Sequence, residues 1–525
     1  MIRISGSGLT VDDVYRIAVD CAAIEIDAGQ LKAAHESSDR VKTWGSEGRP
    51  VYGVTTGFGE MVYMSIPAHF EVELQENLVR SHAAGGGPVF GTEISRAIMA
   101  SRLNCLIRGY SGISGEALEL MAEFLNRGIH PLVPQQGSLG ASGDLAPLAH
   151  VALPLIGAGK VEYRGEIVDS AQAMASESLA PVRLGYKDGL ALINGTSGMT
   201  GAASIAIVRA ERLLRLALWA SGAFVEVVRG STRAFDHRGH ELKNHQGQIR
   251  VAAAVRAHLA GSEMTLEHEE IMARISAART SPDEVEKAPE YLQNAYTVRC
   301  IPQILGPVLD SIEYCRRIVE EELNSCNDNP LIFDLPESTF HGGNFHGQYV
   351  AMASDFLNIA VAEIGVLAER QLNRLLDPHL NKTYPPFLAI GNPGLFSGLQ
   401  GSQYLATSIA SENMDLAAPS SIKSIPSNGQ NQDVVSMGLI SARKSHALID
   451  NVHTIVSVLV AAIYQASAIA GRGRFSEGTQ EFLEILENKI EPYRDDREVA
   501  SEYLAKIRLL SDSNEITEFL QRWAA

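Results

Sequence analysis

Long stretches with apolar residues at three- and four-residue spacing dominate the second half of the chain. The segments GAASIAIVRAERLLRLALWASGAFVEVV (201–228) and DFLNIAVAEIGVLAERQLNRLL (355–376) each carry one such stripe, and similar patterns recur at 307–325 and 436–470. This spacing puts the apolar side chains on one face of an α-helix. Several long stripes joined by short loops predict a bundle of long helices.

The first part of the chain alternates between helical patterns and stretches rich in turn-forming residues. Residues 1–50 suggest a short strand followed by helices, whereas GSEGRPVYGVTTGFGE (45–60) and HPLVPQQGSLGASGD (130–144) contain too much Gly and Pro for a helix. We expect Asp144 to cap a helix whose first turn tolerates Pro147.

The predicted fold is therefore mainly α, with a loop-rich N-terminal domain packed on a bundle of long central helices. A chain of 525 residues is longer than one compact core usually holds. We expect an N-terminal domain at 1–200, a central long-helix bundle at 201–470, and short C-terminal helices at 471–525.

Composition indicates a soluble protein with few classes of partner. Hydrophobic residues make up 45% of the chain, and the formal net charge is -18, which disfavours binding to nucleic acid or anionic membranes. Residues 1–20 carry acids where a signal peptide needs an apolar run, and the most apolar stretch, Ile455 to Tyr464, is too short to span a bilayer. The five cysteines form no CxxC pair, as expected of reduced thiols in the cytoplasm.

The tripeptide Ala141-Ser142-Gly143 can form an electrophile from the chain itself. In a sharply folded chain, the backbone nitrogen of Gly143 can attack the carbonyl carbon of Ala141, and the missing Cβ of Gly143 removes the main clash. Loss of water from the ring and from the Ser142 side chain leaves a conjugated exocyclic methylene. A helix beginning near Asp144 would stabilise negative charge on this group. Taken alone, however, the same three residues also form an ordinary turn before a helix.

Other chemistries lack their sequence patterns. The spacing of His237, His240 and His245 fits no standard zinc site, and His268 lies among glutamates, so we expect no metal. No phosphate-binding glycine motif is present, so we expect no nucleotide, and Ser142 lacks the GxSxG frame of a hydrolase nucleophile.

Six motifs together resemble a known enzyme family. They are YGVTTGFGE (52–60), GSLGASGDLAPLAH (137–150), GLALINGTSGMTG (189–201), NDNPLIF (327–333), GGNFHGQ (342–348) and NGQNQDVVSMG (428–438).

In this order the motifs are similar to those of the histidine, phenylalanine and tyrosine ammonia-lyases and aminomutases, and the resemblance covers roughly residues 10 to 470. It implies a 4-methylidene-imidazol-5-one group (MIO), formed autocatalytically from Ala141-Ser142-Gly143. It also implies a homotetramer whose active sites are assembled from several subunits.

The resemblance assigns roles to further residues. Tyr52 matches the base that removes a β-proton of the substrate, Arg299 the arginine that binds its carboxylate, and Asn194 the asparagine that contacts electrophile and carboxylate. Without the flanking GVTTG, Tyr52 would be an ordinary packed loop tyrosine, and an arginine between apolar residues is usually a surface or interface charge. On local grounds, Asn194 suits a capping or turn position about equally well. The remaining matched site residues are Gln293, Tyr296, Phe345, Asn431 and Gln432.

Three positions bear on the substrate. His82 and Tyr404 match residues that hydrogen-bond the phenol of tyrosine, and such a site discriminates against phenylalanine. Gln432 replaces a glutamate of the histidine-specific members. Glu60 resembles a glutamate of the bacterial tyrosine 2,3-aminomutases, to which the likeness is greatest, although Phe58 replaces their tyrosine.

The resemblance thus implies conversion of L-tyrosine to β-tyrosine through a bound 4-hydroxycinnamate. A tyrosine or broader aromatic ammonia-lyase, releasing p-coumarate and ammonia, is the alternative. An inactive homologue with a structural or binding role is the third possibility. One departure from the family pattern is Asn294, where an aspartate is usual, and we assign it no role.

Overall fold

The computed structural model describes residues 1–281, 283–499, 503–511 and 513–523. These residues form two compact units. The first unit comprises Met1–Val208, Tyr314–Leu357 and Pro419–His446, and the second comprises Arg209–Glu313, Asn358–Ala418 and Ala447–Ala525. The predicted boundaries of three domains stay a prediction.

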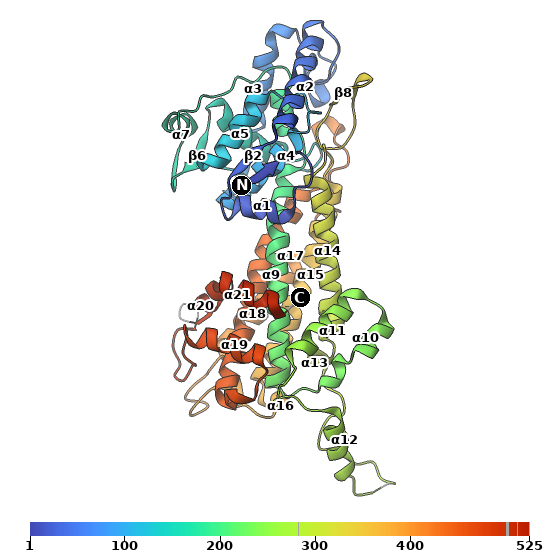
Figure 1. The fold of residues 1–525 in the computed structure, drawn as a ribbon, viewed down its shortest axis with the longest axis vertical. Coiled ribbons are helices and arrows are strands. Elements are labelled where there is room, and N and C mark those ends of the chain that lie inside the picture. The colour runs from blue at the N-terminus through green and yellow to red at the C-terminus, as the bar shows by residue number, and fades with distance from the viewer. Residues whose placement is uncertain (282, 500–502, 512, 524–525) are drawn as a thin grey trace. The chain divides into compact units, whose positions relative to one another are not determined.

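Four long helices contribute residues to both units. They are α9 (Ser197–Val227), α14 (Ile301–Leu323), α15 (Gln348–Leu376) and α18 (Gly438–Ala470), labelled in Figure 1. The sequence predicted each of them, and the mainly α fold class is confirmed. Helices α9, α14 and α15 begin several residues before their apolar stripes, whereas α18 lies within its stripe, and α14 contains Pro307.

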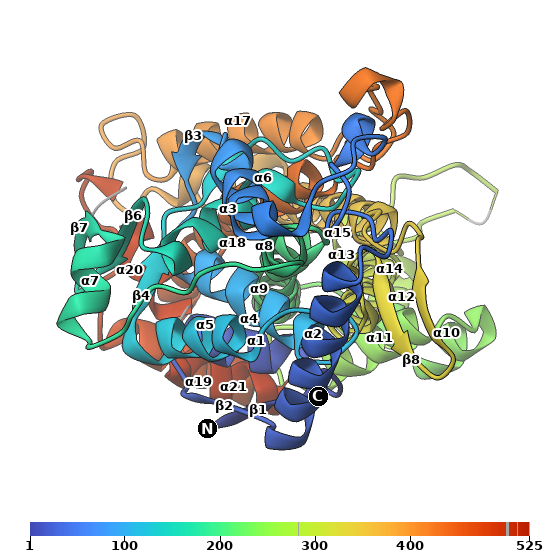
Figure 2. The same ribbon diagram turned by 90° about the horizontal axis from the view of Figure 1, so that it is seen from above.

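The first unit is built around α4 (Thr92–Leu106), which is buried on nearly all sides. α1 (Val11–Ala18) and α5 (Gly115–Arg127) both pack against it, as seen in Figure 2. The other helices that lie wholly in this unit are α2 (Ala28–Ser46), α3 (Glu71–His82), α6 (Leu145–Ala152), α7 (Ser170–Ser176) and α8 (Asp188–Ile193).

Short strands fix the loops of the first unit. Strands β1 (Ile2–Ile4) and β2 (Ile24–Ile26) pair in parallel, and β8 (Leu331–Asp334) forms an antiparallel hairpin with β9 (Glu337–Phe340).

Two further antiparallel sheets hold the segment before the tripeptide. One pairs β3 (Gly86–Val89) with β5 (Pro134–Gln136), and the other has the order β4 (Ile129–Pro131), β6 (Lys160–Tyr163), β7 (Glu166–Asp169). Strands β4 and β5 lie within the stretch predicted to be a loop.

The second unit is a helical bundle held by apolar packing and a few buried polar contacts. Ser221 on α9 hydrogen-bonds Gln371 on α15, and α17 (Gln400–Leu416) bonds to α15 through Thr407 and Glu369. The remaining helices are α10 (His237–Lys243), α11 (Gln246–His258), α12 (His268–Ala277), α13 (Tyr296–Arg299), α16 (Pro378–Asn381), α19 (Glu477–Glu487), α20 (Ala505–Ser511) and α21 (Asn514–Trp523). The last three are the short helices expected near the C-terminal end.

By length and composition alone, α15 and α18 are long and apolar enough to cross a membrane. The ten apolar residues from Ile455 to Tyr464, too short by themselves to span a bilayer, are only one part of α18. Within the chain, 67% of the apolar window of α15 and 83% of that of α18 is buried. Core helices of soluble proteins show the same combination.

Candidate active site

The tripeptide lies in a tight turn that only glycine can complete. Gly143 has a φ of 71°, and a Cβ built on it would lie 2.0 Å from the carbonyl oxygen of Gly195. Ala141 is only 5% exposed and packs with Val435 and Met437. Helix α6 begins at Leu145, so its N-terminal end directly follows the tripeptide, as the sequence predicted.

Two of the side chains that the sequence predicted for the site form hydrogen bonds with Ser142. Asn194 donates from Nδ2 to the carbonyl oxygen of Ser142 over 3.0 Å, and Gln432 donates from Nε2 to its Oγ over 2.9 Å. Asn194 is 4% exposed, and its Oδ1 has no hydrogen-bond partner among the described residues. A buried acceptor without a partner costs free energy, so this oxygen is well suited to bind a ligand.

Tyr52 lies in the predicted loop, and its Oη accepts a hydrogen bond from the backbone N–H of Gly59 over 2.9 Å. Phe58 meets the Tyr52 ring edge-on, with ring centroids 6.4 Å apart. Glu60 is exposed in the short 3₁₀ helix Gly59–Met61, beside Gly429. Tyr52 and Glu60 thus belong to the same loop, joined by the hydrogen bond from Gly59 to Tyr52.

His82 and Phe345 also belong to the first unit. His82 ends α3, and its Nδ1 lies 3.0 Å from the carbonyl oxygen of Leu78. Phe345 lies in the loop before α15, which is tied to the segment of the tripeptide because Gly347 N donates to Gly140 O over 3.2 Å.

The other predicted site residues belong to the second unit, except Asn431, which is exposed in the first. The guanidinium of Arg299 lies over the ring of Tyr296, 4.6 Å from its centroid, and Arg299 Nε is buried without a hydrogen-bond partner among the described residues. Gln293 is exposed, and Tyr404 accepts a hydrogen bond from Gln400 over 2.9 Å.

Asn294, which received no role from the sequence, accepts a hydrogen bond at Oδ1 from Ser231 N over 2.8 Å. It therefore holds the backbone after α9.

The prediction that Asp144 caps the helix following it is wrong. Asp144 occupies the N-cap position of α6, but its side chain makes no capping bond there. Its carboxylate instead accepts a hydrogen bond from the N–H of Met199, in the first turn of α9, over 2.6 Å, and another from Ser138 Oγ over 2.6 Å. Complete burial raises the pKa of Asp144 to about 6. The residue thus joins the tripeptide to a different helix.

Arg102 is a buried charge that the sequence analysis missed. Its Nη2 donates to the carbonyl oxygen of Asn194 over 2.7 Å, and its Nη1 donates to Asn327 Oδ1 over 3.0 Å. A Cβ on Gly195 would lie 2.1 Å from Nη1 of Arg102. The sequence gave no signal for this role, because the partners of Arg102, the carbonyl oxygen of Asn194 and the side chain of Asn327, lie far along the chain.

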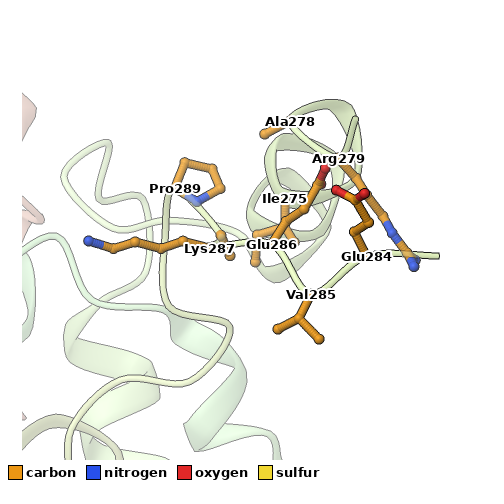
Figure 3. Close-up of a pocket in the computed structure, with 9 residues that line it drawn as sticks. Ile275, Ala278, Arg279, Glu284, Val285, Glu286, Lys287 and Pro289 are labelled. Atoms are coloured by element: carbon orange, nitrogen blue, oxygen red, sulfur yellow. The ribbon is translucent and has the colours of Figure 1, made fainter. Parts of the chain in front are cut away.

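A cavity of about 270 Å³ lies beside α12 in the second unit. None of the predicted site residues lines it. Its lining consists of Ile275, Ala278, Arg279, Glu284, Val285, Glu286, Lys287, Ala288 and Pro289. In Figure 3 the Arg279 and Lys287 side chains extend in opposite directions, so they do not converge on one anion. The carboxylate of Glu286 already accepts a hydrogen bond from the backbone N–H of Thr280. This cavity has no feature of the predicted chemistry.

Comparison with known proteins identifies the family of the chain. The family model described as aromatic amino acid lyase matches residues 9–488. A tyrosine 2,3-aminomutase from Chondromyces crocatus is 57% identical over 495 residues, covering 94% of this chain and 93% of that protein. A MIO-dependent tyrosine 2,3-aminomutase from Streptomyces globisporus is 44% identical over 522 residues, covering 99% and 96%.

Among solved structures, the crystal structure of a tyrosine aminomutase from Streptomyces globisporus superposes with a TM-score of 0.95 at 43% identity. The match covers 99% of this chain and 98% of that one. With nearly the full length matched in sequence and in structure, the chain belongs to the aromatic amino acid lyase family.

Proposed function

We propose that this protein is a MIO-dependent tyrosine 2,3-aminomutase, which converts L-tyrosine to β-tyrosine through a bound 4-hydroxycinnamate. The observation that carries the proposal is the setting of Ser142, bound by Asn194 and Gln432 within the tight turn closed by Gly143. The same activity is named for the relatives described above.

The MIO group is formed autocatalytically from Ala141-Ser142-Gly143, with loss of two water molecules and without metal or nucleotide. The site fits such a group, because the positive φ of Gly143 and the absence of a Cβ permit the sharp turn that brings Gly143 N toward the Ala141 carbonyl. Once formed, the group supplies an electrophilic methylene carbon to the substrate amine.

The side chains of the chain bind the substrate and move its proton. Tyr52 removes the β-proton, with its phenol oriented by the N–H of Gly59. Arg299 pairs with the substrate carboxylate, because a guanidinium binds a planar carboxylate in bidentate fashion. Because an amide oxygen accepts and never donates, we assign the unpaired Oδ1 of Asn194 to the substrate amine, in place of the carboxylate that the family resemblance implied.

Tyrosine is the preferred substrate because His82 and Tyr404 pair with its phenol. The contact between His82 Nδ1 and the carbonyl oxygen of Leu78 places the ring proton on Nδ1. His82 Nε2 is then an acceptor for a phenol O–H. Gln432 carries no charge to pair with an imidazole, so histidine is disfavoured.

Glu60 assigns the chain to the aminomutases rather than to the ammonia-lyases. A mutase holds the arylacrylate until the amine returns to the β-carbon, and a lyase releases p-coumarate and ammonia. Glu60 lies in the 3₁₀ helix Gly59–Met61, whose Gly59 N–H binds Tyr52 Oη, and there it can act on the amine as it returns. The ammonia-lyase is the second candidate, supported by the family description.

The proposal is tested by incubating the purified protein with L-tyrosine and identifying the products by chiral chromatography with mass detection. β-Tyrosine with little free coumarate is the expected result. Coumarate and ammonia alone would establish the lyase, and no product together with an unmodified protein mass would establish an inactive homologue.

We further propose a cytoplasmic homotetramer with shared active sites, with no nucleic-acid or membrane partner. The surface of α15 supports association, because Tyr349, Met352, Phe356 and Ile359 follow one another at helical spacing and are all exposed. Light scattering measures the oligomer.

Shared sites are tested by co-expressing the Ser142→Ala and Arg299→Gln variants. Each variant alone should be inactive, and the mixture should recover part of the activity if the two residues come from different subunits. A mixture as inactive as the single variants would contradict sharing of the site between these residues.

A further inference from the structure

The loop from Ser427 to Gln432 has an unusual backbone. Asn428, Gly429 and Gln430 have φ angles of 52°, 61° and 66°, so three consecutive residues lie in the left-handed region. Asparagine tolerates this region and glycine favours it, but glutamine does not. The loop is closed by two backbone bonds between Ser427 and Gln432, of 3.0 and 3.3 Å. A strained conformation held by its surroundings is typical of functional sites.

One side of this loop packs against Gly59 and Glu60, in the loop that also carries Tyr52. A Cβ on Gly59 would lie 2.6 Å from Nδ2 of Asn428, and a Cβ on Gly429 would lie 3.3 Å from Cγ of Glu60. Gly59 in turn donates its N–H to Tyr52 Oη. Asn428 and Gly429 therefore pack directly against Gly59 and Glu60, next to the phenol of Tyr52.

The other end of the loop is bound to the tripeptide. Gln432, which closes the loop, donates from Nε2 to Ser142 Oγ. A continuous chain of contacts thus runs from Tyr52 and Glu60 through the loop to Ser142, and all of it belongs to the first unit.

We infer that the loop Ser427–Gln432 is a spacer that sets the position of Glu60 relative to Ser142, with Gly429 and Asn428 as positioning residues for the return of the amine. The inference rests on the proposed aminomutase function. Elimination requires the base and the electrophile, whereas return of the amine to the β-carbon also requires Glu60 in place. Displacement of Glu60 therefore slows the second half of the reaction more than the first, and arylacrylate escapes.

The test compares Gly429→Ala with Gly165→Ala. Gly165 lies between β6 and β7 with a φ of 81°, and a Cβ there would meet no atom within 4 Å. Both substitutions place alanine at a positive φ, but only the first pushes on Glu60. Asn428→Gly is a second variant, which accepts the left-handed backbone and removes only the amide packed on Gly59.

The readouts are the ratio of coumarate to β-tyrosine formed from saturating L-tyrosine, the intact mass that reports MIO formation, and the melting temperature. In Gly429→Ala and Asn428→Gly the ratio should rise roughly tenfold, as expected when a reacting group is displaced by a fraction of an ångström. The intact mass should remain that of the mature protein, and Gly165→Ala should keep the wild-type ratio.

An unchanged ratio in both loop variants overturns the inference, as does an equal rise in Gly165→Ala. The wild-type arm separates this failure from that of the proposed function. Wild-type protein that forms β-tyrosine keeps the proposed function even when the loop variants behave like wild type. Wild-type protein that forms only coumarate overturns both.

Discussion

Gln432 Nε2 and Ser142 Oγ are joined by a hydrogen bond of 2.9 Å, although 290 positions separate the two residues in the sequence. Asn194 binds the carbonyl oxygen of the same serine. The hydroxyl that would leave during the proposed MIO formation and the peptide that would enter the ring are therefore held by side chains from two distant segments.

Gln432→Ala and Asn194→Ala should each slow maturation of the tripeptide. Loss of either hydrogen bond frees Ser142 to adopt conformations that do not lead to ring closure. Intact-mass spectrometry should detect a fraction of protein that retains the two water molecules. Gln172→Ala, an exposed glutamine on α7, is the control and should mature completely. Complete maturation of both site variants would contradict the role of these contacts.

The Tyr52→Phe variant should still form the MIO group but should turn over L-tyrosine slowly. Because we propose that the phenol takes the β-proton, its loss should lower the consumption of L-tyrosine by roughly 10²–10⁴-fold, the usual contribution of a general base. The mass should still be that of the MIO-containing protein. Tyr63→Phe, at an exposed tyrosine of the neighbouring segment, should retain activity. Comparable rates for Tyr52→Phe and wild type would remove Tyr52 from the mechanism.

Asp144 should make the stability of the wild type depend on pH. Its pKa is raised from 3.8 to about 6 by burial, so the folded protein keeps a proton that the unfolded chain releases. The free energy of unfolding should fall as the pH rises from about 4 to about 6, by about 3 kcal/mol at ~1.4 kcal/mol per pKa unit. Above that range the contribution of Asp144 is constant.

Urea unfolding at fixed protein concentration measures this effect as the difference between wild type and Asp144→Asn. The difference should change between pH 4 and 6, because the variant has no carboxyl group to titrate at this position. A difference that is the same at every pH in this range would show that Asp144 is ionised at its ordinary pKa.

Removing one partner of the buried ion pair Lys187–Asp328 should destabilise the fold more than removing both partners. Their Nζ and Oδ2 atoms are 2.6 Å apart, and both side chains are fully buried. Lys187→Met should lower the free energy of unfolding by about 3–5 kcal/mol, because it leaves an unpaired carboxylate in the interior. The double variant Lys187→Met/Asp328→Leu should recover much of this loss. Urea midpoints measure both, and a double variant no more stable than Lys187→Met would contradict the prediction.

The sequence predicted the parts of the molecule that depend on local patterns. The helical stripes gave α9, α14, α15 and α18, because a helix face is encoded within a few turns. The tripeptide and the start of α6 at Leu145 were also predictable from the sequence, because Gly143 and the following apolar run are adjacent.

What escaped prediction depends on partners far along the chain. Asp144 binds Met199 instead of its own helix, and Arg102 binds the carbonyl of Asn194. The left-handed backbone of Gln430 also escaped, because nothing in a glutamine side chain favours a positive φ. In each case tertiary contacts outweigh the preference that the local sequence expresses.

The distance along the chain between Ser142 and its neighbours has a consequence for biosynthesis. The surroundings of the tripeptide include Val435 and Met437, which are translated long after it. Proteins are made and begin to fold from the N-terminal end. If the MIO group forms as proposed, a nascent chain on the ribosome carries an ordinary serine, and no reactive methylene is exposed to cellular thiols until the segment around Val435 has joined the fold.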